Sequence, residues 1–386
     1  MKTIRTIECS GDAYEMGRHQ GSELKDSIMD IIKYYETSEE FSSATGNIIS
    51  PFRLLGLIGS ASTAAARLGA SETARQWGKR VEGIAAGAGI DKALARGIQA
   101  METMLAFPLG VSQCTTVGVT AKRSDGMGPV LLKNYDISEK LRPTTFMRRS
   151  RPMGKLESFE MIINVLAGSH LVMNEEGLCL SYNYGMVNFL PRPFGILPTY
   201  AVQYAAENFT ETRQVIGWVS EQATTNGCIM TVVDAKSNLC VIEKAGGHTE
   251  VRYPEDGVTV ATNHFLTRDM KHYNYDVSAV FGKRAPAALR GFSVQESNET
   301  RMKRALELTG LEENGKQSRE KISAADLRAL ASDHDGKEQG DEKTICRHHD
   351  AMQTLASIIV IPKKRKILLC NGHPCSAPFE ELEPWG

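Results

Sequence analysis

Residues 113–136, QCTTVGVTAKRSDGMGPVLLKNYD, constrain the fold more than any other stretch of this chain. The segment CTTVGVT is β-branched and alternating, KRSDGMG carries an Asp-Gly turn signal, and PVLLKNYD is a second apolar run, which together predict a β-hairpin. Antiparallel pairing would bring Cys114, at the head of the first strand, close to Asp136, at the end of the second. A thiol near a carboxylate is a plausible start for a nucleophilic site. The hairpin alone favours the simpler alternative of a buried cysteine in an ordinary sheet.

The composition is that of a globular protein, with 41% hydrophobic and 24% charged residues among 386. The net charge of −1 shows no basic excess that would indicate nucleic acid or an anionic membrane as a partner. The chain begins without the apolar run of a signal peptide and contains no apolar run of 18 residues. Eight cysteines are too sparse for a disulfide framework. We therefore expect a cytoplasmic protein with free thiols.

The pattern changes near position 110, from helical to strand-rich. Residues 2–10 predict a short strand, and Asp12 opens a helix that runs to about residue 36. Residues 51–98 are rich in Ala, Leu, Arg and Gly and again predict helix. Within them, residues 83–89 superficially resemble a dinucleotide-binding loop, but the third glycine is misplaced and no strand precedes them. Close helix packing, or a helix end at Gly89, is the better interpretation.

After Cys114 the chain predicts many short antiparallel strands with helices between and after them. The predicted strands are 159–168, 170–185, 228–235, 239–246, 258–265, 354–362 and 366–372, and the predicted helices are 199–222 and 298–310. Residues 311–345 are polar and predict a surface helix and loop. This order favours an α+β fold, with two stacked sheets covered by helices.

Two short segments contain the residue types that bind metals. They are Cys346-Arg-His348-His349-Asp350 and Cys370-Asn-Gly-His373-Pro-Cys375. Neither has a Cys-x2-Cys pair with the spacing of a tetrahedral site. The sequence therefore predicts no metal and no cofactor.

Several short motifs follow one another along the chain, and each is weak by itself. They are Gly11-Asp-Ala-Tyr-Glu15-Met-Gly17 with Gly21, Glu82-Gly-Ile-Ala-Ala-Gly-Ala-Gly89, Cys114-Thr115-Thr116, Lys133-Asn134-Tyr135-Asp136, Asn174 to Asn183, Thr262-Asn263-His264-Phe265, Ser297 with Arg301 and Arg304, Asp333-His334, Ile345-Cys346-Arg347-His348, and Gly372-His-Pro-Cys375. In order and spacing they resemble the penicillin acyltransferase family of autoproteolytic acyltransferases and amidohydrolases. That family belongs to the N-terminal-nucleophile hydrolases and is related to the choloylglycine hydrolases.

The resemblance implies a four-layer αββα sandwich made as an inactive precursor. Such precursors cut themselves before the cysteine, which here would separate a pro-segment, 1–113, from a catalytic chain, 114–386, with both pieces staying associated. Attack of the Cys114 thiol on the Gln113 carbonyl gives an N→S acyl shift, and hydrolysis frees an α-amine. The unperturbed pKa of that amine is about 8, so it can act as general base to its own thiol. The family usually has Gly where this chain has Gln113, a change that would slow the shift without forbidding it.

The resemblance also implies roles for individual residues. Cys114 would be the nucleophile, Asn263 the oxyanion donor, and Asp136 the carboxylate that orients the new amine. Arg301 and Arg304 lie three apart on one helical face, and one of them would pair with Asp136 or with the cysteine region. The remaining implied contacts with substrate are Asn134, Tyr135, Asn183 and His264. Lys133 stands where the choloylglycine hydrolases carry Arg, and its role stays open.

We therefore expect an amide hydrolase that cleaves a small N-acyl amine or N-acyl amino acid through a thioester. Acyl transfer from acyl-coenzyme A or an amide to an amine is the alternative, and an unprocessed binding protein is the second. The expected partners are a small-molecule amide and the chain's own pro-segment, without nucleic acid or membrane; a homo-oligomer stays open.

Overall fold

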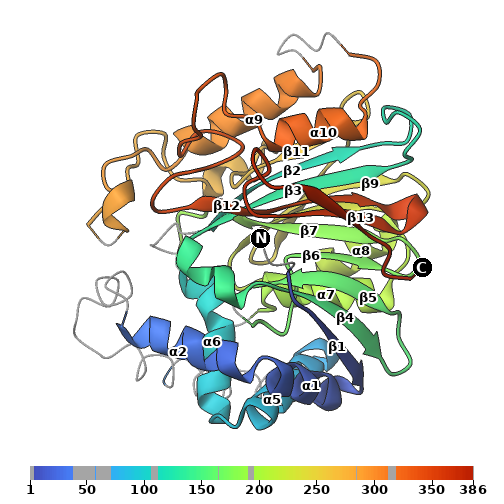
Figure 1. Ribbon diagram of the computed structural model, residues 1–386, viewed down its shortest axis with the longest axis vertical. Coiled ribbons are helices and arrows are strands. Elements are labelled where there is room, and N and C mark those ends of the chain that lie inside the picture. Colours follow the sequence, from blue (N-terminus) through green and yellow to red (C-terminus); the bar gives the residue numbers. More distant parts are fainter. Residues whose placement is uncertain are drawn as a thin grey trace.

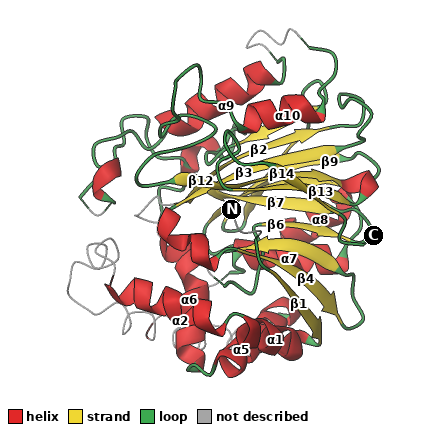
Figure 2. Ribbon diagram, viewed as in Figure 1, coloured by secondary structure: helices red, strands yellow, loops and turns green. Residues whose placement is uncertain are grey.

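Two β-sheets stack face to face, and helices cover both outer faces (Figures 1 and 2). The computed structural model describes residues 4–37, 57, 71–105, 112–163, 165–189, 195–283, 285–311 and 319–385. Helices α9 (Glu296–Leu308) and α10 (Ala324–Ala331) contact the six-stranded sheet. Helices α7 (Pro198–Asn208) and α8 (Thr212–Glu221) contact the eight-stranded sheet. The predicted αββα sandwich is thus confirmed.

The eight-stranded sheet has the order β1 (Thr6–Gly11), β4 (Phe146–Pro152), β5 (Ser158–Ile162), β6 (Leu171–Asn174), β7 (Cys179–Gly185), β8 (Gly227–Val233), β9 (Leu239–Ala245) and β10 (His248–Arg252). The six-stranded sheet has the order β11 (Val258–Ala261), β2 (Ser112–Val119), β3 (Val130–Ile137), β12 (Gln353–Ile361), β13 (Lys366–Asn371) and β14 (Phe379–Leu382). The other helices are α1 (Ala13–Glu23), α2 (Lys25–Thr37), α5 (Glu72–Ala88), α6 (Lys92–Leu105) and the short 3-10 turns η1 (Glu139–Thr144), η2 (Lys271–Tyr273), η3 (Ala287–Leu289) and η4 (Pro362–Lys364).

The central strands are buried on both faces, because each sheet lies between the other sheet and a layer of helices. Every residue of β3, β7, β8 and β9 is buried. Such strands lose the alternation of a half-exposed strand, and their polar residues must find partners inside the protein. On one face Thr116 and Lys133 contact the neighbouring sheet. On the other face Gln113 and Thr115 contact α9, and Asn134 contacts α10.

Most predicted elements are confirmed, with shifted ends. The first strand begins at Thr6, the helix from Asp12 breaks at Leu24 into α1 and α2, and residues 170–185 divide into β6 and β7. The helical prediction for 51–98 is confirmed by α5 and by the start of α6, while 51–70 lie outside the described residues except for 57. In the predicted surface segment 311–345, α10 forms the helix, and 312–318 lie outside the described residues.

Helices α1 and α5 pack at very short distance through four glycines. A Cβ atom at Gly17 would lie 1.9 Å from the carbonyl oxygen of Arg80, and one at Gly83 would lie 2.1 Å from that of Tyr14. Gly21 and Gly87 are in the same situation, at 2.2 Å from a backbone oxygen. The helix α5 then ends at Gly89, which has a left-handed conformation with φ of 71°. Close helix packing and a glycine helix end, the two interpretations of this motif, are therefore both confirmed.

The segment before Cys114 is tied to the rest of the chain by a strand and by buried charges. β1 pairs in parallel with β4 at the edge of the eight-stranded sheet. Arg80 of α5 forms a buried ion pair with Glu207 of α7, at 2.7 Å. Gln20 of α1 accepts a hydrogen bond from the buried guanidinium of Arg148 at 2.6 Å. These contacts are independent of the peptide bond at Gln113–Cys114.

The α1–α5 contact predicts opposite effects for two alanine substitutions in one helix. Gly83→Ala should destabilise the protein by about 3 kcal/mol or more, because its methyl group would overlap backbone of α1. Gly78→Ala should stabilise it by up to about 1 kcal/mol, since the nearest atom to its Cβ is a flexible Arg96 side chain at 3.9 Å. Thermal unfolding midpoints of the two variants measure the difference. Equal midpoints would contradict the proposed role of the glycines.

Candidate active site

The register of β2 and β3 decides which side chains meet. Cys114 lies opposite Tyr135, and Gln113 lies opposite Asp136. Because side chains alternate along a strand, Cys114 points to the same face as Lys133 and Tyr135, whereas Gln113 and Asp136 point to the other. The predicted hairpin is confirmed, and Cys114 and Asp136 are neighbours along it. Their side chains, however, stand on opposite faces of the sheet.

The face with Cys114 looks into the space between the two sheets, where Lys133 is the nearest cation. The Lys133 ammonium is fully buried and donates hydrogen bonds to Ser181 Oγ and Asn183 Oδ1, both at 3.2 Å, and to the Tyr182 carbonyl. Burial lowers the pKa of Lys133, and interaction with the Cys114 thiol opposes the shift. Burial also raises the pKa of Cys114, which Lys133 opposes. Cys114 is therefore a buried thiol with a raised pKa beside the amino group of Lys133.

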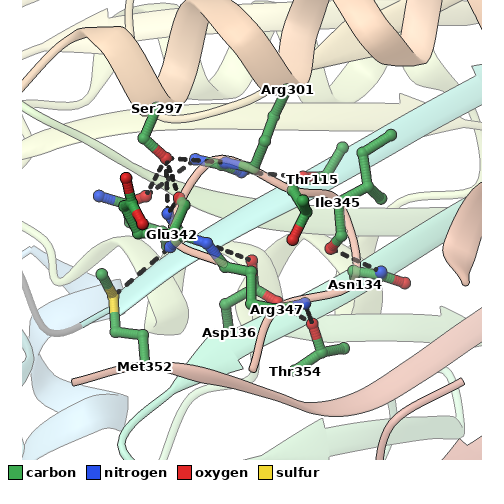
Figure 3. Close-up of polar contacts among 12 residues, drawn as sticks. Thr115, Asn134, Asp136, Ser297, Arg301, Glu342, Ile345, Arg347, Met352 and Thr354 are labelled. Carbon is green, nitrogen blue, oxygen red and sulfur yellow. Dashed lines mark hydrogen bonds and ion pairs between the residues drawn. The ribbon is translucent and has the colours of Figure 1, made fainter. Parts of the chain in front are cut away.

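The opposite face is organised by the buried guanidinium of Arg301, which extends from α9 towards Thr115 of β2 (Figure 3). Its Nη1 donates to the carbonyl oxygen of Cys114 at 2.7 Å and to Thr115 Oγ1 at 2.8 Å. Its Nη2 donates to Oε1 of Gln113 at 3.0 Å. The side chain of Gln113 is thus bound within the site, with Ser297 Oγ donating to the same oxygen at 3.3 Å.

Asn263, just beyond β11, presents its carbonyl oxygen to Cys114. The backbone N–H of Cys114 donates to Asn263 Oδ1 at 3.0 Å, and Arg301 Nη2 donates to the same oxygen at 3.2 Å. Asn263 Nδ2 donates to the Tyr184 carbonyl at 2.8 Å. Two donors at Oδ1 and an acceptor at Nδ2 define the orientation of this amide.

Asp136 is buried between a hydroxyl and a second arginine. Thr354 Oγ1 donates to its Oδ1 at 2.7 Å, and Nε of Arg347 lies 4.0 Å from its Oδ2. Burial raises the pKa of Asp136, and the charges of Arg347 and Arg301 oppose the shift. Figure 3 shows Arg347 between Asp136 and Ser297, in the loop before β12. Its Nη2 lies 2.5 Å from Ser297 Oγ, so Arg347 and Arg301 share this serine.

A model of the acyl-coenzyme A:6-aminopenicillanic acid acyl-transferase family matches residues 122–375, which is more than half of the chain. The chain belongs to this family. The match includes Lys133, Asp136, Asn263 and Arg301 and begins eight residues after Cys114. A search of curated protein sequences finds no match. The resemblance drawn from the sequence motifs is thus confirmed.

Solved structures with a similar chain path include three hydrolases or acylases. The Caenorhabditis elegans N-acylethanolamine-hydrolyzing acid amidase ortholog has a TM-score of 0.44 at 12% identity, covering 65% of this chain and 93% of that one. A variant of conjugated bile acid hydrolase from Clostridium perfringens has a TM-score of 0.40 at 11% identity, covering 70% and 96%. Penicillin V acylase from Agrobacterium tumefaciens has a TM-score of 0.35 at 12% identity, covering 68% and 76%. Likenesses this distant carry no argument about the reaction of this family member.

The structure separates the two candidate arginines of the acyl-transferase motif. Arg301 is fully buried at the Gln113–Cys114 segment. Arg304 lies on the outer side of α9, where its guanidinium pairs with Asp333 at 2.8 Å and with Glu307 at 3.3 Å. Its side chain is 28% exposed. Arg304 therefore belongs to a surface ion-pair group and not to the site.

The residues predicted to contact substrate occupy different surroundings. Asn183 uses Nδ2 for the Ala261 and Thr262 carbonyls and bridges the two sheets. Asn134 points towards α10 and donates to the Ala331 and Ile345 carbonyls. Tyr135 is buried against the ring of His170. His264 lines a cavity of about 200 Å³ beside α9, together with Glu299, Met302, Lys303, Leu306, Glu307 and Leu311. Cys114 does not line that cavity.

Sequence reasoning missed two residues at the Asp136 end of the site. Arg347 belongs to the Ile345-Cys346-Arg347-His348 motif, but nothing in the pattern indicates that it reaches Asp136. Thr354 stands at the start of β12, and nothing in the sequence marks it as a site residue, because threonine is common in strands. Its contact with Asp136 depends on the pairing of β12 with β3.

Four metal-ligating side chains also converge, at the end of the six-stranded sheet beyond Arg347. They are His334, Cys346, His348 and Cys375, whose ligand atoms all lie within 4.8 Å of one another. The sequence spacing did not indicate this group, because the four residues come from three separate segments. Among the described residues no helix is long and apolar enough to cross a membrane.

The buried ring of His170 predicts a specific acid sensitivity. Burial, together with Lys133, lowers the pKa of His170 to about 3. The unfolded chain binds this proton with a pKa of about 6.5, so between pH 6.5 and 3 the unfolded state holds more protons and stability falls as the pH falls. At pH 4.5 the loss due to His170 is about 2 to 3 kcal/mol. His170→Gln removes it.

Urea unfolding midpoints between pH 7 and pH 4 measure this effect. The midpoint of His170→Gln should fall less steeply with decreasing pH than that of the wild type. His272→Gln, which removes an exposed imidazole, controls for the loss of a histidine as such. Parallel curves for His170→Gln and wild type would contradict the prediction.

Proposed function

We propose that this chain is a cysteine N-terminal-nucleophile amidohydrolase, activated by cleavage of its own Gln113–Cys114 bond. One observation carries the proposal. Buried polar groups hold the N–H of Cys114, the carbonyl of Cys114 and the side chain of Gln113, all around one peptide bond. β11 pairs with β2 only as far as Thr116, so side chains and not a strand bind the backbone of Cys114 on that side.

The proposed cleavage begins at the Cys114 thiol. As its proton leaves, Sγ attacks the carbonyl carbon of Gln113, the C–N bond breaks, and the amide nitrogen takes up a proton to become an amine. The product is a thioester between Gln113 and Cys114. Water then cleaves the thioester and leaves a carboxylate at Gln113 and a free α-amine and thiol at Cys114. The Lys133 ammonium stabilises the thiolate during the attack, which is the role that we assign to this cation.

The same groups serve the mature enzyme. Asn263 Oδ1, which accepts the Cys114 N–H in the intact chain, holds the new amine so that its lone pair faces the thiol. A primary amide carries two N–H bonds, and Asn263 donates one to Tyr184. The second stabilises the oxyanion, a contribution of about 3–4 kcal/mol to the barrier. Asp136 stands opposite Gln113 in the register, so departure of Gln113 opens the carboxylate to the new amine.

The substrate is a linear amide whose acyl group passes to Cys114 as a thioester. Water completes a hydrolysis, and an amine completes an acyl transfer. Acyl transfer is the second candidate function, because the family takes its name from an acyl-transferase that uses acyl-coenzyme A. Product analysis with an N-acyl amine, in the presence and absence of a second amine, distinguishes the two. The substrate-contact roles of Asn134, Tyr135, Asn183 and His264 remain predictions of this scheme.

Intact mass spectrometry of the purified protein tests the proposal directly. The wild type should give two masses, for residues 1–113 and 114–386, which elute together on gel filtration because β1 and the Arg80–Glu207 pair hold them. Cys114→Ala should give one mass. Gln113→Gly should cleave faster than wild type. An N-acyl substrate should add its acyl mass to the 114–386 piece alone. A wild type that stays in one piece and takes up no acyl group would leave only the binding-protein alternative.

The two arginines of α9 provide a matched pair of variants. Arg301→Lys should slow both self-cleavage and turnover by about 100-fold or more, because an ammonium cannot span the Cys114 carbonyl, Gln113 and Asn263 together. Arg304→Lys should change either rate by less than about threefold, since it alters only a partly exposed pair. Equal rates for both variants would remove Arg301 from the mechanism.

A further inference from the structure

The four side chains His334, Cys346, His348 and Cys375 have a geometry that goes beyond the proposed reaction and does not depend on it. His334 follows α10, Cys346 and His348 lie in the loop before β12, and Cys375 follows β13. Three segments thus bring two sulfurs and two imidazoles to one point. Thiolate and imidazole are the ligands of structural zinc sites, and an S₂N₂ set is typical of them.

Two distances within the group match those around a tetrahedral ion. Nε2 of His348 lies 3.5 Å from Cys346 Sγ and 3.3 Å from Cys375 Sγ. Zinc bonds of about 2.3 Å to sulfur and about 2.0 Å to nitrogen, at tetrahedral angles, put those atoms about 3.5 Å apart. An imidazole nitrogen has one lone pair, so it cannot accept hydrogen bonds from both thiols. One cation between them satisfies all three atoms.

A second layer of contacts fixes the orientation of His348. Its Nδ1 lies 2.8 Å from Nδ1 of His373, and Nε2 of His373 lies 3.1 Å from Oε1 of Gln353. The glutamine oxygen takes the Nε2–H of His373, which leaves His373 Nδ1 as an acceptor, and this nitrogen lies 3.3 Å from Nε2 of His348 as well. The two rings are nearly perpendicular, at 75°, with centroids 3.9 Å apart. His373 thus packs against the imidazole whose Nε2 lies near both sulfurs, and partners beside a zinc-binding histidine help to orient it.

Two further observations point to a ligand at this place. Nε2 of His334 is buried and has no hydrogen-bond partner among the described residues. Cys375 is exposed, whereas the other seven cysteines are buried. The group is therefore open to solvent on the Cys375 side, and an ion can enter there.

We propose that His334, Cys346, His348 and Cys375 bind one Zn²⁺ as a closed structural site. Four protein ligands leave no open position for water, so the ion stabilises the fold and takes no part in catalysis. Arg347 lies between two of the ligands in the chain, and it faces Asp136 and Ser297. By holding Cys346 and His348, the ion fixes the loop that presents Arg347, so that Arg347 acts as a positioning residue for Asp136.

Metal analysis of the full-length, untagged protein tests this assignment. Elemental mass spectrometry should find about one zinc per chain after purification without chelator. Cys375→Ser and His348→Gln should each lose it, whereas the control variants Cys240→Ala and His349→Gln, at a buried thiol outside the cluster and at the neighbouring histidine, should retain it. Co²⁺ exchanged into wild type should show thiolate charge-transfer bands and tetrahedral d–d absorption. Both signals should be absent from Cys375→Ser.

The second layer gives an independent readout. His373→Phe should lower the affinity for Zn²⁺ by about 10- to 100-fold, measured by competition with a chromophoric chelator. Wild type that stays metal-free when folded, reduced protein is given Zn²⁺ would overturn the proposal. A Cys346–Cys375 disulfide, found by peptide mapping of protein kept under reductant, would also overturn it. Equal zinc content in the two cluster variants and the two control variants would do the same.

Discussion

The site depends on one buried interaction, the contact of the Arg301 guanidinium with the Gln113–Cys114 segment. A guanidinium without solvent must donate its hydrogen bonds to protein acceptors, and Arg301 does so to β2, to Asn263 and to its own helix. Removing these acceptors would leave a buried charge unpaired, at a cost of several kcal/mol. The charge therefore fixes α9 over β2, and the Gln113–Cys114 peptide bond is held as a consequence of satisfying that charge.

The proposed self-cleavage requires contacts that keep residues 1–113 bound to the rest of the chain without involving the cut bond. Elements α1, α5 and β1 make contacts of this kind. The glycines let α1 and α5 pack closely against each other. Arg80 and Gln20 join this helix pair to Glu207 and Arg148 in the core. Removing one partner of a buried ion pair such as Arg80–Glu207 destabilises a protein more than forming the pair stabilises it. The pair therefore favours this one arrangement of α5 on α7 even where its net contribution to stability is small.

The layered fold, the hairpin and the glycine contact could be predicted from the sequence, because each has a local pattern. The register of the hairpin could not be predicted from the sequence. A shift of the strand pairing by one residue would place Asp136 opposite Cys114 and not opposite Gln113. Strand β4, FMRRSRP, escaped prediction because its charges look like a surface segment. Arg148 is nevertheless fully buried, since Glu160, Gln20 and Gln203 contact it from other elements. No pattern within the strand contains that information.

The same limit applies to the proposed zinc ligands, and it explains why the sequence spacing indicated no metal site. Spacing rules work for sites built on one short loop, where two cysteines stand close in sequence. In this chain strand pairing brings the distant ligands together. Because β12 and β13 are paired, the segment before β12 and the segment after β13 reach the same edge of the sheet. Cys346 and Cys375 meet there as a result of strand pairing. The pairing of β12 with β3 also brings Thr354 to Asp136, so one strand aligns both the candidate metal site and the acidic end of the active site.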